Sequence, residues 1–310
     1  MTTKTIKAGD SNAYKAWFQS DLLSRHIHYH FTFGADPSAY KSKKMAMVSM
    51  LFSVPSLNSP NLRPTKRYSG MDFATSNQEA VSVGVKITQG EGNLPKLVLT
   101  SDHGSEAEIY LFGGCITSWK VPSGRDLLFV RPDAVFNKKK PISGGIPHCF
   151  PQFGPGPMQQ VILNTKSIST ELIVTNTDKK PFSFSSALHS YFRASITGVS
   201  VKGLKGCKTL NKDPDPKNPI EGREERDVIT FPGFVDCIYL DAPDEVHLDN
   251  GLGDVISIRN TNWSDAVLWN PHLQMEACYK DFVCVENAKI GTVQLEPEQL
   301  WIAKQHLSIG

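Results

Sequence analysis

The amino-acid sequence predicts an all-β fold for most of this 310-residue chain. From residue 81 onward, apolar and polar residues alternate with a period of two in one segment after another, which is the pattern of half-buried strands. Clusters of Gly, Pro, Asn, Asp and Ser separate these segments, and no stretch shows a sustained helical period. Many short strands joined by turns indicate a sandwich or a barrel, formed as one domain by residues 78–310.

The expected strands follow one another along this domain. The segment "AVSVGVKIT" alternates up to Ile87, and "EAEIYLFGG" places Ala107 and Ile109 on one side. In "SISTELIVTNT" the alternation runs from Ile168 to Val174. The segments "DVISIRN", "TVQLEP" and "LWIAKQHLSI" continue the same pattern towards the C-terminus, so we expect strands along the whole domain.

One long segment breaks the pattern. Residues 211–227, "NKDPDPKNPIEGREERD", are rich in charge and proline and show no apolar periodicity. Asp213 and Asp215 are of a type that can bind metal ions. Because proline and charge together oppose packing into a core, we expect a solvated surface loop here instead.

Composition excludes several classes of function. With 40% apolar and 21% charged residues the chain is of ordinary globular type, and no apolar run approaches the length that crosses a bilayer. Residues 1–71 carry a net charge of +7 and the remainder −5, so the body has no basic face for nucleic acid. Six scattered cysteines without a CxxC pair indicate buried thiols and a reducing compartment, not a disulfide framework. We expect a monomer.

The N-terminal segment, residues 1–77, is expected to be an extension that is mostly disordered. Between Asp36 and Asp72 it holds seven serines, six Lys or Arg and no acidic residue. This composition is typical of a transit peptide, which would make the protein chloroplastic. A secretory signal, a tail without any address and a cytoplasmic location are the alternatives.

Three alternating histidines in this extension, His26, His28 and His30, would share one face of a strand and so have the spacing for a zinc site. No cysteine or carboxylate lies close enough in sequence to complete the ligand set. We therefore interpret them as incidental.

Three expected strands carry polar side chains among apolar neighbours. His189 stands in "FSFSSALHSYFRA", Glu286 in "KDFVCVENAKIG" and Asp236 in "FPGFVDCIYL". A carboxylate in an apolar strand is unfavourable unless it is paired, and its pKa tends to rise, whereas a histidine titrates near neutral pH. Such groups suit general acid–base catalysis. A core histidine, a glutamate at a strand's exit into solvent and a turn-capping aspartate are the structural alternatives, and spacing does not tell whether the three residues converge.

Seven segments between residue 80 and the C-terminus carry a resemblance: "GGCITSWKV", "DLLFVRPDAVF", "SGGIPHCFPQFGP", "ALHSYFRA", "GFVDCIYL", "AVLWNP" and "DFVCVENAKIG". As an ordered set they resemble the glucose-6-phosphate 1-epimerase family, the hexose-phosphate mutarotases related to aldose 1-epimerases. The resemblance implies a galactose mutarotase-like β-supersandwich that interconverts the α and β anomers of a hexose phosphate through the open chain, without cofactor or metal. It also implies that Glu286 is the base at the anomeric hydroxyl, His189 the acid at the ring oxygen and Asp236 a ligand of sugar hydroxyls. Gln152 and Trp269 become candidates for the wall of the site, with packing as the alternative for each.

The chain departs from the family pattern after Gln160. Relatives continue "PQFGP" with a Gln-His-Gly motif and an Arg, whereas here Gln159 and Gln160 are followed directly by "VILNTKSISTEL", so an internal segment is expected to be missing and the sheet truncated. Ser143 also stands where many relatives have an Arg before the two glycines. The resemblance assigns the absent arginines to phosphate binding, so we expect impaired activity and doubtful phosphate specificity. A non-catalytic sugar or sugar-phosphate binding protein and a non-functional splice product are the alternatives.

Overall fold

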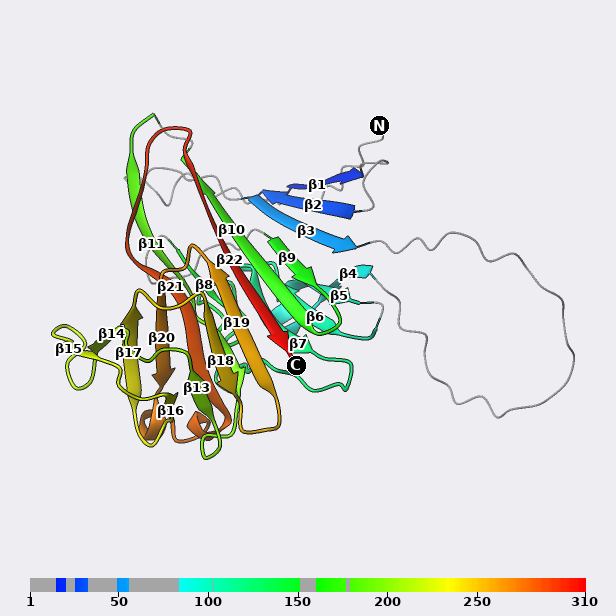
Figure 1. The fold of residues 1–310 in the computed structure, drawn as a ribbon. Helices are drawn as coiled ribbons and strands as arrows, with labels where there is room; N and C mark the ends of the chain where they lie inside the picture. The colour runs from blue at the N-terminus through cyan, green and yellow to red at the C-terminus, as the bar shows by residue number, and fades with distance from the viewer. Residues whose placement is uncertain are drawn as a thin grey trace, which may run out of the picture.

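The computed structural model describes residues 84–101, 103–150, 160–176 and 179–310, together with the backbone of three strands before residue 56. These residues form three β-sheets (Figure 1). The described part has only three short 3-10 helices, η2 (Glu91–Asn93), η3 (His272–Met275) and η4 (Tyr279–Asp281). Within it, no helix is long and apolar enough to cross a membrane. The predicted all-β fold is confirmed.

The largest sheet has ten strands. Strand β10 shows why the period-two pattern works, because Ile168, Leu172 and Val174 on one side are buried and Glu171 on the other side is partly exposed. In the order of the sheet the strands are β1 (Lys15–Ser20), β2 (His26–Thr32), β3 (Ser49–Pro55), β9 (Gln160–Leu163), β10 (Ser167–Thr175), β22 (Leu300–Ile309), β19 (Val255–Thr261), β18 (Glu245–Asp249), β13 (Ser200–Lys202) and β16 (Val228–Ile229).

The second sheet has eight strands, all antiparallel to their neighbours. Its longest strand, β21, joins two segments that the sequence pattern separates, "DFVCVENAKIG" and "TVQLEP". In order the strands are β15 (Ile220–Arg223), β14 (Lys208–Asn211), β17 (Val235–Leu240), β20 (Asp265–Asn270), β21 (Phe282–Leu295), β11 (Phe182–Leu188) and β8 (His148–Cys149), while β12 (Tyr191–Arg193) pairs with β21.

The third sheet is a four-stranded meander that adds a further layer to the core. Ala107 and Ile109 are buried as predicted, but Ile87 in the edge strand is 53% exposed. The edge strand has a neighbour on one side only, so its alternation is not a guide to burial. The strands are β4 (Gly84–Gln89), β5 (Pro95–Thr100), β6 (Glu106–Tyr110) and β7 (Cys115–Lys120).

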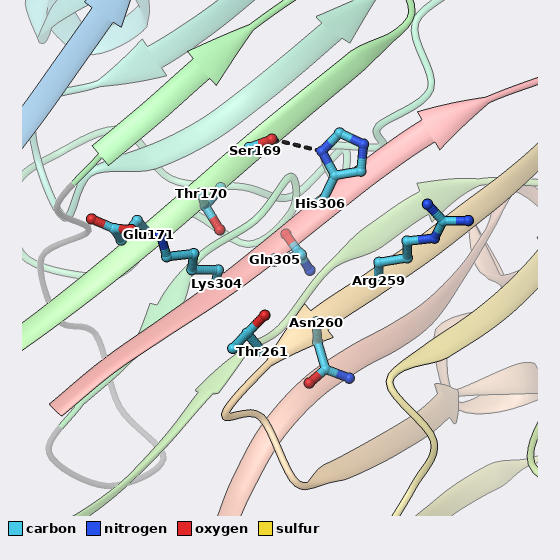
Figure 2. A pocket seen from close by; sticks show the side chains of 9 residues that line it. All are labelled: Ser169, Thr170, Glu171, Arg259, Asn260, Thr261, Lys304, Gln305 and His306. Atoms are coloured by element: carbon cyan, nitrogen blue, oxygen red, sulfur yellow. Dashed lines mark hydrogen bonds and ion pairs between the residues drawn. The ribbon is translucent and has the colours of Figure 1, made fainter.

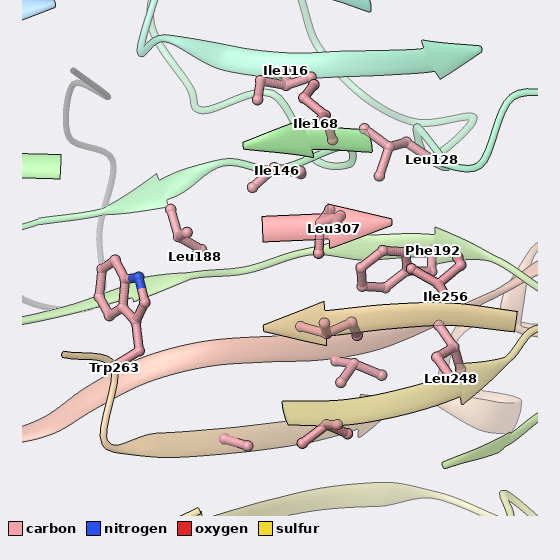
Figure 3. Close-up of a cluster of buried hydrophobic side chains, with 14 of the residues drawn as sticks. Ile116, Leu128, Ile146, Ile168, Leu188, Phe192, Leu248, Ile256, Trp263 and Leu307 are labelled. Atoms are coloured by element: carbon pink, nitrogen blue, oxygen red, sulfur yellow. The ribbon is translucent and has the colours of Figure 1, made fainter. Parts of the chain in front are cut away.

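One continuous hydrophobic core joins the three sheets (Figure 3). Ile256 and Leu307 come from the ten-stranded sheet, Leu188 and Phe192 from the eight-stranded sheet, and Ile116 from the meander. Four of the six cysteines are buried, in line with the prediction of buried thiols. Burial of apolar side chains on the inner faces of both large sheets therefore fixes which faces remain for function.

The surface segment 211–227 is largely exposed, as predicted, and Asp213 and Asp215 do not come together with other ligands in the described part. The segment is not only a loop, because β15 lies within it and pairs with β14. Alternation is lost there because all four residues of β15 are exposed and none needs to face a core.

The junction after Gln160 lies inside β9. This strand pairs with only four residues of β10, from Ile168 to Glu171, whereas β22 pairs with all nine. On its other side β9 pairs with β3 of the N-terminal segment. The predicted boundary between residues 77 and 78, and the transit peptide, stay predictions. The side chains of His26, His28 and His30 lie outside the described residues.

Candidate functional site

The register of the eight-stranded sheet brings His189 and Glu286 together. Strand β11 pairs Leu188 with Asn287, and β12 pairs Tyr191 with Cys284. The same antiparallel register therefore holds on both sides of the two-residue break between β11 and β12. Continued across the break, it sets His189 directly opposite Glu286, with both side chains on the same face of the sheet.

The two side chains meet as this register requires. Nε2 of His189 lies 3.3 Å from Oε1 of Glu286, and the His189 side chain is 26% exposed whereas that of Glu286 is 3% exposed. Oε2 of Glu286 is buried and has no hydrogen-bond partner among the described residues. A buried carboxylate oxygen without a partner is unfavourable unless a ligand completes it. Nε2 of His189 is likewise buried and has no hydrogen-bond partner among the described residues, so the pair offers two unpartnered polar atoms to a bound molecule.

Burial decides the charge state of the pair. It raises the pKa of Glu286 well above its ordinary value, and nearby Asp236 raises it further, while Lys212 lowers it. Burial also lowers the pKa of His189 to about 4, helped by the positive charges of Arg131 and Lys212. Both shifts favour the neutral form of each group. A neutral acid and a neutral base thus lie 3.3 Å apart, within the distance over which a bound hydroxyl could reach both.

Aromatic rings hold the imidazole in place. His189 stacks on Tyr191 with ring centroids 4.6 Å apart and 10° between the planes, and Trp269 meets it edge-on at 5.7 Å. Trp269 also packs against Phe282 at 5.8 Å. The predicted wall residue Trp269 thus lies beside His189. A planar apolar wall of this kind suits the C–H face of a sugar ring.

Asp236 lies across the sheet from this pair. Strand β17 pairs Asp236 with Trp269, which in turn pairs with Cys284 on β21, so the three residues form one cross-strand row. Lys212 donates hydrogen bonds of 2.9 and 3.2 Å to the two carboxylate oxygens of Asp236. The structure therefore brings His189, Glu286, Asp236 and Trp269 to one face, which spacing in the sequence did not determine.

Two glycines at the edge of the site allow three chain segments to meet. The nitrogen of Gly145 donates to the carbonyl of Phe129, and the nitrogen of Tyr191 donates to the carbonyl of Gly145. Gly144 and Gly145 have φ of +135° and +69°, and a Cβ on Gly145 would lie 2.0 Å from the carbonyl oxygen of Ile116. Only glycine satisfies both the backbone angle and this close approach. Tyr191, two residues after the imidazole of His189, is thereby joined to the segments of Gly145 and Phe129.

A metal ion is chemically conceivable at this site. His189, Cys284 and Glu286 each offer one ligand atom, and these atoms lie within 4.8 Å of one another. Imidazole, thiolate and carboxylate are the ligand types of zinc. However, burial raises the pKa of the Cys284 thiol well above its usual value, and a thiol binds zinc only as the thiolate. The expectation that no metal takes part stays a prediction.

Gln152, the remaining candidate from the sequence, lies outside the described residues. Two further histidines have structural surroundings. His148 is buried and its Nε2 lies 2.9 Å from the hydroxyl of Ser186, while His272 packs against Tyr279. Ser143 is partly buried at the edge of the site.

Sequence reasoning missed three residues of this face: Tyr191, Lys212 and Arg131. Tyr191 and Arg131 stood within the motifs "ALHSYFRA" and "DLLFVRPDAVF", which was the only signal for them. Lys212 stood in the expected surface loop and carried none. Its pairing with Asp236 comes from the pairing of β14 with β17.

A pocket of about 290 Å³ lies elsewhere, on the ten-stranded sheet (Figure 2). It is lined by β10, β19 and β22, and none of the predicted site residues lines it. Its polar groups already pair with each other, since Ser169 and His306 lie 2.7 Å apart and Lys304 forms an ion pair with Glu171. The pocket approaches the site only through Gln305, whose amide nitrogen reaches Ser190 and Asn287.

Comparison with known proteins gives one family. The model of the aldose 1-epimerase family matches residues 95–161 and 159–308. Together these segments take in more than half of the chain. They meet at residues 159–161, which include Gln160, the residue after which a missing segment is expected from the sequence.

Two curated relatives share this similarity. A protein of Cenchrus ciliaris described as "Putative glucose-6-phosphate 1-epimerase" is 29% identical over 288 residues, covering 72% of this chain and 87% of the relative. A protein of Escherichia coli K12 with the same description is 27% identical over 245 residues, covering 61% and 81%. The first alignment extends over 288 positions but takes in only 72% of the 310 residues of this chain, so part of the relative has no counterpart here.

Solved structures show the fold. A protein of Salmonella typhimurium described as "a putative mutarotase" has a TM-score of 0.62 at 21% identity, covering 75% of this chain and 95% of that chain. A galactose mutarotase-like protein of Clostridium acetobutylicum has a TM-score of 0.56 at 12% identity, covering 74% and 98%. The galactose mutarotase-like β-supersandwich predicted from the resemblance is therefore confirmed.

Proposed function

The chain belongs to the aldose 1-epimerase family, and from this premise we propose that it interconverts the α and β anomers of a hexose 6-phosphate by acid–base catalysis. The observation that carries the proposal is the His189–Glu286 pair, 3.3 Å apart on one face of the sheet with Oε2 of Glu286 unpartnered among the described residues. Anomer exchange requires a proton donor and a proton acceptor that reach two oxygens of the same sugar.

The reaction is a proton exchange at two oxygens of the same sugar. Glu286 removes the proton of the anomeric hydroxyl while His189 gives a proton to the ring oxygen, and the bond between C1 and the ring oxygen breaks. Rotation about the C1–C2 bond of the open-chain aldehyde presents its other face. Reversal of both transfers closes the ring as the other anomer, so no proton is gained or lost.

The free site has to redistribute its proton before this step. Burial favours the neutral form of both groups, which leaves Glu286 protonated and His189 uncharged. A sugar hydroxyl that donates to Glu286 stabilises the carboxylate, because a hydrogen bond to the charged form lowers its pKa. The proton then moves across the 3.3 Å gap to His189, so substrate binding creates the active protonation state.

Asp236 and Trp269 would position the sugar. The carboxylate of Asp236 keeps acceptor capacity beside its ion pair with Lys212 and can bind ring hydroxyls. Trp269 offers a flat apolar wall beside His189. For Gln152 only the resemblance supports a binding role. The reaction needs no cofactor, and we expect a monomeric protein that binds a small hexose phosphate and neither nucleic acid nor membrane.

We further propose that this chain is impaired relative to its family. The family match breaks at residues 159–161, and β9 covers only four of the nine residues of β10. Without an orienting side chain from that region, misplacement of the sugar would reduce the rate by about 10²-fold. The acid-poor composition of the N-terminal segment supports import into chloroplasts, with a cytoplasmic location as the alternative.

The test is saturation transfer between the anomers of glucose 6-phosphate, followed by NMR with purified, cooperatively unfolding protein. We expect exchange above the spontaneous rate, and we expect Glu286→Gln to lower it by about 10²–10⁴-fold. Glu276→Gln, at an exposed glutamate of the segment between β20 and β21, is the matched control. Exchange that persists unchanged in Glu286→Gln would refute the proposal.

A non-catalytic sugar-phosphate binding protein is the second candidate, favoured by the break at residues 159–161. It predicts binding of glucose 6-phosphate by folded protein together with exchange no faster than in buffer. Exchange that depends on Glu286 would exclude it.

A further inference from the structure

Arg131 is a cation of the site that the proposed mechanism leaves without a role. The bridge between Val130 and Gly144 and the hydrogen bond from the nitrogen of Arg131 to the carbonyl of Ser143 set these two residues directly opposite each other. Arg131 is thus the cross-strand neighbour of the partly buried serine at the edge of the site. Its side chain is 17% exposed.

The guanidinium of Arg131 lies beside the imidazole side of the site. It interacts with the hydroxyl of Tyr191, whose ring stacks on His189 at 4.6 Å. Its positive charge lowers the pKa of His189. Arg131 stands two residues after Phe129, whose side chain belongs to the buried cluster of Tyr191 and Phe282 that Trp269 packs against. Lys212, by contrast, is paired with Asp236. Arg131 therefore lies on the His189 side of the site.

The chemistry of the substrate requires a cation on this side. In a hexose 6-phosphate, C5 carries both the ring oxygen and C6, and C6 carries the phosphate. A sugar with its ring oxygen at His189 and its anomeric hydroxyl at Glu286 must therefore extend its phosphate past His189. A guanidinium is the donor that binds a phosphate through two parallel hydrogen bonds.

We propose that Arg131 is the phosphate-binding residue of this chain and forms an anion subsite next to His189, an inference that rests on the proposed function. An internal carboxylate holds this fork. Arg131 donates to both oxygens of Asp133, at 2.9 and 2.5 Å, and Asp133 is 66% exposed. An ion pair with so exposed a partner is weak, so a phosphate dianion can displace Asp133.

Two substitutions of opposite effect test the subsite by calorimetric titration with glucose 6-phosphate and with glucose. Arg131→Met should weaken binding of glucose 6-phosphate by about 10–100-fold, because a charged hydrogen bond is removed, and leave glucose unchanged. Asp133→Asn should tighten glucose 6-phosphate by about two- to five-fold, because it releases the guanidinium. Arg193→Met removes another arginine of the same region, which lies over Phe129, and should change neither sugar.

The outcomes separate this inference from the proposed function. Equal loss for both sugars, loss in Arg193→Met instead, or no binding of glucose 6-phosphate by the unchanged protein would overturn the subsite. If Arg131→Met does not unfold cooperatively, the Asp133→Asn variant provides the test. Unchanged or weaker binding of glucose 6-phosphate by Asp133→Asn would overturn the subsite. Anomer exchange is measured on the same samples. If binding of glucose 6-phosphate depends on Arg131 but no anomer exchange is measured, the subsite is supported and the enzymatic proposal is refuted.

Discussion

The side-chain nitrogen of Gln305 donates a hydrogen bond of 2.8 Å to the side-chain oxygen of Asn287. The same nitrogen lies 3.1 Å from the hydroxyl of Ser190. These two partners directly follow Glu286 and His189 in the chain, so one side chain of β22 ties both segments of the acid–base pair to the ten-stranded sheet. Gln305 is 1% exposed, so solvent does not replace these hydrogen bonds.

Gln305→Met should therefore slow the reaction more than it weakens substrate binding. The substitution keeps the length of the side chain and removes both hydrogen bonds, which lets His189 and Glu286 shift relative to each other. We expect kcat to fall by about 10-fold or more with KM little changed, because misplacement acts on the transition state. Gln294→Met, at an exposed position of β21, is the control. Equal changes in kcat after both substitutions would contradict the positioning role.

The two groups of the pair should give stability profiles of opposite slope. Because the pKa of Glu286 is raised above its ordinary value of 4.5, the folded protein retains a proton that the unfolded chain releases above pH 4.5. The contribution of this group to stability is therefore lost as pH rises. His189 has its pKa lowered from 6.5 to about 4, so its contribution is lost as pH falls through that window.

Melting temperatures of two variants check these slopes. The gain of Glu286→Gln over the unchanged protein should grow from pH 4.5 to pH 8, and the gain of His189→Asn should grow from pH 6.5 to pH 4. The His189 window is worth about 3 kcal/mol at most, from about 1.4 kcal/mol for each pKa unit. Parallel profiles for all three proteins would show that neither pKa is shifted by burial.

Gly145→Ala should destabilise the protein through a backbone clash. The new Cβ would lie 2.0 Å from the carbonyl oxygen of Ile116, at a φ of +69°. Gly113→Ala has a comparable φ of +74° with nothing within 4 Å, so it isolates the cost of the backbone angle, about 1 kcal/mol. In denaturant unfolding we expect Gly145→Ala to lose more stability than this control. A smaller loss than for Gly113→Ala would mean that the Gly145 segment can move freely.

Removal of metal ions should leave anomer exchange unchanged. The reaction proposed for His189 and Glu286 uses only protons, although Cys284 completes a set of three donors with them. Protein dialysed against a strong chelator should retain its exchange rate. A loss that added zinc restores would assign these three side chains to a metal centre instead.

The sequence by itself determined the fold class and the chemistry that is present. Period-two alternation predicted strands such as β10, whose apolar side is buried as expected, because half-buried strands must alternate whatever their neighbours are. His189, Glu286 and Asp236 stood out because polar side chains are unfavourable in apolar strands. A segment missing after Gln160 was also expected from the sequence, and it stays a prediction, supported by the two parts of the family match that meet at residues 159–161.

Only the tertiary structure decided which of these groups meet. The pairing of His189 with Glu286 depends on the register between strands almost a hundred residues apart, and the pattern of a single strand carries no register. Arg131, Lys212 and Gln305 reach the site from three other strands or turns, so each is an ordinary residue in the sequence and a neighbour of the pair only after folding. Long-range pairing of β-strands, which local sequence does not encode, is the physical reason for this difference.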